Sequence, residues 1–115
     1  MTKCDALYVM RKIMAELKIP RHTVFMSDRD LMKLGADRYL VRKLIRDVEQ
    51  SDEDPIWTVR RTYQMLEDTL VNSDDGRPES HTACSMMLNT VGAVLQTLHA
   101  WDGQWTQNTR EERYL

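Results

Sequence analysis

The segment Ser27–Arg46, which reads SDRDLMKLGADRYLVRKLIR, decides how the first half of the chain folds. Gly35 divides it into two stretches with helical patterning. Glycine readily adopts the left-handed conformation that ends a helix. We therefore expect one short helix over residues 28–34, a turn at Gly35 and a second helix over residues 38–50.

The second of these helices carries a row of arginines. Arg38, Arg42 and Arg46 recur every four residues and so share one face. Like charges at this spacing destabilise a helix by roughly 0.2–0.5 kcal/mol per pair, and Arg38 and Arg42 have no acidic residue three or four positions away on this helix. Lys43 adds a fourth cation, and the Tyr39 hydroxyl could contact a phosphate. These five residues are the candidate site, and they indicate an anionic partner.

The same segment resembles a helix-turn-helix DNA-binding motif over about 20 residues. That resemblance implies a helix that reads the major groove of DNA, with these basic side chains on phosphates or base edges, and a homodimer that binds two half-sites. The matching positions are Leu34 before the turn, Gly35, Ala36 and Asp37 within it, and Val41 and Leu44 on the inner face of the second helix.

Two positions depart from that motif. Asp30 and Leu31 stand where the pattern has an apolar and then a small residue, and a bulky Leu31 would push the crossing helices apart. Two other interpretations of the arginine row stay open. The row could be solvated or paired with the acidic segment Asp52–Asp54 and the acidic second half of the chain, or it could form a protein-binding face.

Capping residues mark the starts of three helices. Thr2 with Asp5 resembles a capping box, Ser27 is a good N-cap, and Asp54 followed by Pro55 combines a capping side chain with proline at the first helical position. Pro20 should end the first helix, and Gly103 should end the last one. The remaining expected helices span residues 3–18, 55–72 and 80–101.

Apolar stripes predict how these helices pack. Five apolar residues hold heptad spacing over residues 56–70, and a similar stripe runs over residues 84–101. Joined by the loop at residues 73–79, the two helices read as an antiparallel hairpin. We therefore predict an all-α single domain over residues 1–115, with a three-helix unit over residues 1–50 followed by a long helical hairpin over 54–103.

The wide apolar stripe on the last helix could have either of two roles. It could form the two-fold contact of a homodimer, or it could belong entirely to the intramolecular core. The candidate dimer face consists of Leu88, Val91, Leu95 and Leu98.

Composition narrows the class of protein. The chain has 115 residues, 30% of them charged, a net charge of −2 and only two cysteines. Residues 1–50 carry a net charge of +4 and the rest −6, which points to an anionic partner for the first half. We find no phosphate loop, nucleophile motif, metal-ligand set or apolar span. We expect no enzyme activity, cofactor, metal, small-molecule substrate or membrane insertion, and a cytoplasmic location.

Two functions follow as hypotheses. The first is a non-enzymatic DNA-binding regulator that uses the basic second helix. The alternative is a small protein-binding helical module that acts through the basic face or the hairpin surface. In size and style it resembles the inhibitors or adaptors that mobile elements and phages encode, such as anti-CRISPR proteins, although no motif carries that likeness.

Overall fold

Four α-helices make up the described chain. The computed structural model describes residues 1–18, 26–72 and 78–114, and within the last range it describes the side chains of residues 82–102. The helices are α1 (Lys3–Glu16), α2 (Asp28–Gln50), α3 (Pro55–Asn72) and α4 (Pro78–Tyr114). The prediction of an all-α fold is confirmed for these residues.

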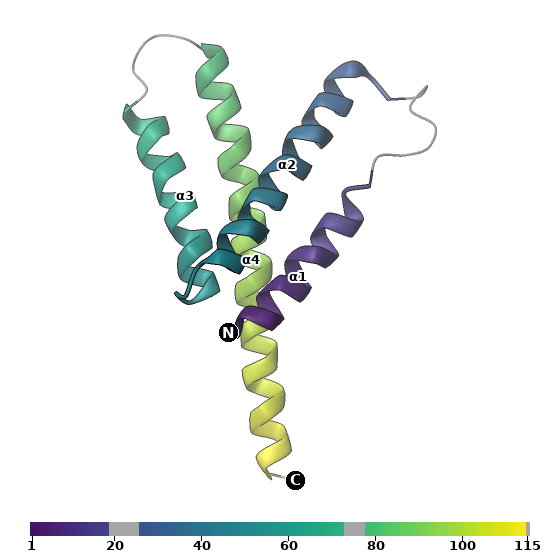
Figure 1. Cartoon of the computed structure of the whole chain (residues 1–115), viewed down its shortest axis with the longest axis vertical. Coiled ribbons are helices and arrows are strands. Elements are labelled where there is room, and N and C mark those ends of the chain that lie inside the picture. The colour runs from purple at the N-terminus through teal and green to yellow at the C-terminus, as the bar shows by residue number, and fades with distance from the viewer. Residues whose placement is uncertain (19–25, 73–77, 115) are drawn as a thin grey trace.

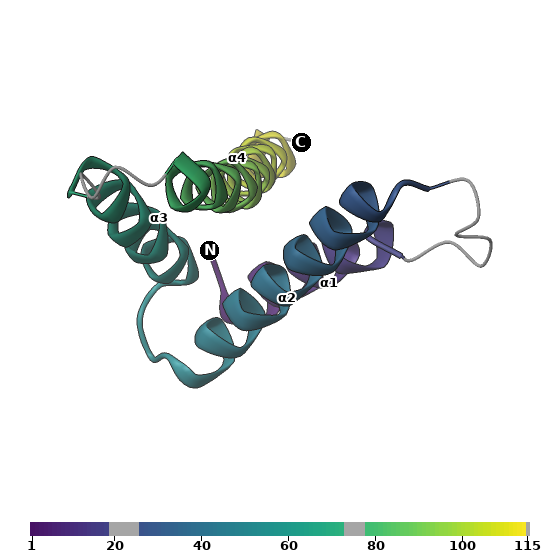
Figure 2. The same ribbon diagram turned by 90° about the horizontal axis from the view of Figure 1, so that it is seen from above.

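The helices form two pairs that meet at one end. α1 lies against α2, and α3 lies against α4. In Figure 1 the two pairs converge near the start of α1 and diverge toward the first residues of α2 and α4. Seen from above, the pairs form separate layers (Figure 2). α4 contacts all three other helices, and its last turns project beyond them (Figure 1).

The predicted caps are present at three helix starts. The Asp5 amide donates to Thr2 Oγ1 at 3.2 Å, and the Asp30 amide donates to Ser27 Oγ at 3.2 Å. The Ile56 amide donates to Asp54 Oδ1 at 2.9 Å. Each bond satisfies an amide that has no acceptor within its own helix. Local sequence therefore fixes where α1, α2 and α3 begin.

The core lies where the two pairs converge. All four helices contribute to it, and the members from α2 and α4 begin at Leu40 and Val91. The inner face predicted for residues 38–50 is confirmed, with Ile45 at the edge of the core. The fully or nearly fully buried residues are Ala6, Val9, Met10, Leu40, Val41, Leu44, Val48, Val59, Val91, Val94 and Leu98.

The predicted turn at Gly35 is wrong. α2 runs without interruption from Asp28 to Gln50, so the first 50 residues hold two helices and not three. The spacing of the apolar residues explains why the helix is continuous. Leu31, Leu34 and Val41 recur at helical intervals, with Arg38 at the intervening position, and so share one face of a single helix. Glycine inside a helix costs only about 1 kcal/mol relative to alanine.

The predicted helix end at Gly103 is also wrong, since α4 continues to Tyr114. A single glycine lowers helix stability without removing a backbone hydrogen bond. Trp101, at the end of the apolar stripe predicted over residues 84–101, packs against the core. Residues 19–25 and most of the predicted loop at 73–79 lie outside the described residues.

Candidate functional site

Arg38 does not belong to a free anion-binding row. It is half-buried, and its Nη1 donates a 2.6 Å hydrogen bond to the Leu17 carbonyl oxygen. Leu17 is the C-cap of α1, and the last carbonyls of a helix lack partners and carry partial negative charge. Arg38 therefore fastens the end of α1 to α2, and this donor of its guanidinium is already used within the fold.

The other four predicted site residues lie on the outer face of α2. Arg42, Lys43 and Arg46 are exposed, and Tyr39 keeps 71% of its surface exposed. Within residues 1–18, 26–72 and 82–102, none of the three cations forms an ion pair or a side-chain hydrogen bond. Three cations that form no ion pair within the described residues, together with one exposed aromatic ring, thus occupy a single helix face.

Three acidic residues near the end of α2, namely Glu49, Glu53 and Asp54, are engaged elsewhere. Glu53 pairs with Arg61, and this hydrogen bond and charge together raise the pKa of the Arg61 guanidinium above its usual value. Asp54 caps α3, and Glu49 pairs with Arg11 of α1 at 3.1 Å. These carboxylates therefore do not neutralise the basic face of α2.

Met32 extends this face by two turns. Its side chain is 75% exposed, and it lies seven residues before Tyr39, which places both on the same side of a continuous helix. Gly35 lies between them, with no atom within 4 Å of where a Cβ would stand. We did not predict Met32 as a site residue, because the supposed turn at Gly35 placed it on another helix.

An open groove separates α2 from α4 where the two pairs diverge. Its volume is about 700 Å³, and most of its wall is apolar. Met86 and Met87 on the α4 side are 38% and 40% exposed. The lining residues are Arg29, Met32, Lys33, Ala36, Asp37 and Leu40 of α2, and Thr82, Ala83, Met86 and Met87 of α4.

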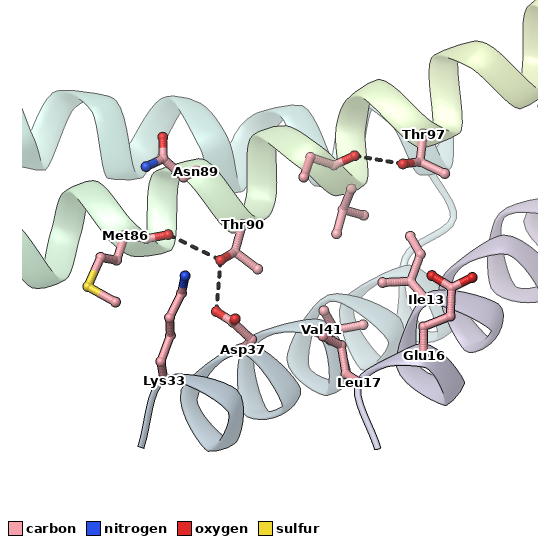
Figure 3. A pocket seen from close by; sticks show the side chains of 12 residues that line it. Ile13, Glu16, Leu17, Lys33, Asp37, Val41, Met86, Asn89, Thr90 and Thr97 are labelled. Carbon is pink, nitrogen blue, oxygen red and sulfur yellow. Dashed lines mark hydrogen bonds between the residues drawn. The ribbon is translucent and has the colours of Figure 1, made fainter. Parts of the chain in front are cut away.

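A smaller pocket of about 390 Å³ continues the groove toward the end of α1 (Figure 3). Lys33, Asp37 and Met86 line both spaces. Thr90 Oγ1 donates to Asp37 Oδ1 at 2.9 Å and also contacts the Met86 carbonyl oxygen at 3.1 Å. This bond joins α2 to α4 among the residues that line the smaller pocket (Figure 3).

The predicted dimer face is not available in this fold. Val91 and Leu98 are completely buried in the core, Leu95 packs against it, and Leu88 is half-buried. The alternative, that this stripe serves the intramolecular core, therefore describes Val91, Leu95 and Leu98.

Other candidate chemistry is sparse among the described residues. Their His, Cys, Asp and Glu side chains contain no group of three that could hold a metal ion, and their helices include none long and apolar enough to cross a membrane. Cys4 and Cys84 are free thiols, exposed and buried respectively. Trp57 is 60% exposed, with the Arg60 guanidinium 5.8 Å from its ring centroid.

Comparison with protein-family models, curated proteins and solved structures finds no match to this chain. The site therefore rests on its own geometry. That geometry is a basic outer face on α2, continuous through Met32 with an apolar groove between α2 and α4.

Proposed function

We propose that this protein is a non-enzymatic, protein-binding helical module of the inhibitor or adaptor type, which binds an acidic surface through α2. The observation that carries the proposal is the outer face of α2, where Arg42, Lys43 and Arg46 are exposed beside an exposed Tyr39 and pair with no acidic group in the described part of the chain. Tyrosine, methionine and arginine are the residue types that protein interfaces favour over the rest of the surface.

The chemistry of this face selects an acidic partner. Carboxylates on the partner would relieve the repulsion between Arg42 and Arg46 and would accept several hydrogen bonds from each guanidinium. Tyr39 and Met32 add apolar contact area on the same face, on the N-terminal side of the three cations. A combination of aromatic anchor and charged rim is typical of surfaces in which a few residues carry most of the binding energy.

DNA binding is the second candidate. The same three cations support it, because phosphate suits them as well as carboxylate does. A helix-turn-helix reader, however, needs a first helix that crosses the recognition helix, and residues 28–34 instead continue the axis of residues 38–50. The net charge of −2 also lowers attraction to a polyanion.

One pair of binding assays separates the two candidates. The purified chain, immobilised, is exposed to a lysate of the cells that produce it, and separately to a random-sequence DNA duplex. Each assay is repeated with the triple variant Arg42→Glu, Lys43→Glu and Arg46→Glu. The control is the Arg60→Glu variant, which changes an exposed arginine on α3.

If the proposal is correct, the wild type and the Arg60→Glu control retain a defined protein from the lysate. The triple variant does not retain it. Retention of duplex with a steep loss as salt rises would favour the DNA candidate. If neither a protein nor the duplex is retained by the wild type, the outer face of α2 is an ordinary solvated surface and both candidates fail.

A further inference from the structure

We propose that the groove between α2 and α4 receives one amphipathic α-helix of a partner protein, with acidic side chains along the edge of that helix that faces α2. This inference rests on the proposed protein-binding function. It adds which element of the partner is bound and where it lies.

The walls of the groove are helical ridges. On the α2 side, Met32, Ala36 and Leu40 follow one another every four residues; on the α4 side, Ala83 and Met87 do the same. Ridges of this spacing accept the side chains of a third helix laid between them. Ala36 and Ala83 are small and so permit a close approach of the incoming backbone.

The chemistry of the lining suits an apolar helix face. Met32, Met86 and Met87 are all substantially exposed, although a methionine side chain gains from burial. Methionine is flexible and polarisable, and it recurs in grooves that bind amphipathic helices.

The charges at the groove give the incoming helix its orientation. Arg29 and Lys33 lie four residues apart on the α2 wall, both exposed, and neither forms an ion pair within the described residues. The one lining carboxylate, Asp37, already accepts the Thr90 hydroxyl. The lining residues of α4 carry no charge. A helix with carboxylates on one edge therefore matches this groove on the α2 side only.

A designed peptide tests the proposal directly. The probe is a fluorescent helix of about 16 residues, near the length at which an isolated helix is stable in water, with leucines at i, i+3, i+4 and i+7 and glutamates along one edge. Two comparison peptides replace the glutamates by lysines or scramble the sequence. Fluorescence anisotropy measures affinity, and ¹³C-methyl methionine NMR locates the peptide.

The proposal expects saturable binding of the glutamate peptide, at least about tenfold weaker binding of the lysine peptide, and none of the scrambled one. The methyl signals of Met32, Met86 and Met87 should shift. Met65 is the matched control, since it is 64% exposed on α3 and lies outside the groove. Met86→Glu should abolish binding, and Met65→Glu should leave it unchanged.

A charge-reversal variant keeps the test decisive if Met86→Glu fails to fold. Arg29→Glu with Lys33→Glu changes only exposed residues and should reverse the preference, so that the lysine peptide binds better. Equal binding of all three peptides, or shifts at Met65 alone, would overturn the proposal. So would a concentration-dependent dimer that Met86→Glu dissociates, because the occupant would then be a second copy of the chain.

The two proposals fail separately. Loss of peptide binding with retention of a protein by the outer face of α2 would refute only the groove. Peptide binding at the groove, with no partner retained through Arg42, Lys43 and Arg46, would refute only the use of that outer face.

Discussion

The two halves of α2 differ in what surrounds them. From Leu40 to Val48 the helix buries four residues in the core shared by all four helices. From Asp28 to Ala36 it buries none, and there it borders an open groove across from α4. One continuous helix thus contains a part that holds the fold together and a part in which Arg29, Met32 and Lys33 are exposed at the groove.

This difference separates stability from binding along a single element. Substitutions of the buried residues in the second half should destabilise the protein, whereas substitutions of exposed residues in either half should alter partner binding with little effect on folding. Four comparisons between paired variants test that separation.

The largest effect is expected in the core. Leu44 is completely buried, and Leu44→Ala should lower the free energy of unfolding by about 2–5 kcal/mol, because it removes buried methyl groups and leaves a cavity. Met32→Ala, at a site 75% exposed, should change it by less than about 0.5 kcal/mol. Urea denaturation followed by circular dichroism measures both. Similar losses for the two variants would mean that the first half of α2 is packed.

Arg38 and Arg42 give the second comparison. Arg38→Ala removes the hydrogen bond to the Leu17 carbonyl and should lower the free energy of unfolding by about 1–2 kcal/mol, since hydrogen bonds from charged donors exceed neutral ones. Arg42→Ala should stay within about 0.5 kcal/mol. Only Arg42→Ala should weaken partner binding. If the two variants are equally stable, the Arg38 hydrogen bond does not stabilise the fold, and Arg38 is a free cation like Arg42.

The bond across the groove gives a third, smaller effect. Thr90→Val removes the donor to Asp37 and should lower the free energy of unfolding by about 1 kcal/mol. The control is Thr97→Val, because the Thr97 hydroxyl donates only to the Ala93 carbonyl of its own helix. Thermal unfolding measures the stability of both variants. If Thr97→Val loses as much stability as Thr90→Val, the hydrogen bond between Thr90 and Asp37 does not hold α2 to α4.

Local chemistry made part of the fold predictable from sequence. The caps at Thr2, Ser27 and Asp54 are side chains that lie within three residues of the amides they accept from. The local sequence is therefore enough to locate them. The inner face of residues 38–50 follows from helical periodicity. Such features do not depend on how distant segments are placed.

The predictions that failed concerned contacts between distant residues and the conformation at Gly35. Nothing near Arg38 in sequence points to its partner Leu17, which lies 21 residues away. Gly35 looked like a turn, although the apolar spacing of Leu31, Leu34 and Val41 continues through it. The groove could not be foreseen, because it depends on the divergence of α2 and α4. A turn at Gly35 would place Met32 and Tyr39 on different helices, so the sequence pattern did not predict that they share a face.

The continuity of α2 is the central claim, because both the basic face and the groove depend on it. Gly35→Ala tests it most directly. With no atom within 4 Å of the added Cβ, the variant should raise the free energy of unfolding by about 0.5–1 kcal/mol through the better helix propensity of alanine. Gly92→Ala should gain less, because its Cβ would stand 3.2 Å from the Tyr63 ring. A loss of stability on Gly35→Ala would contradict the account, since it would mean that Gly35 adopts the left-handed conformation of a turn.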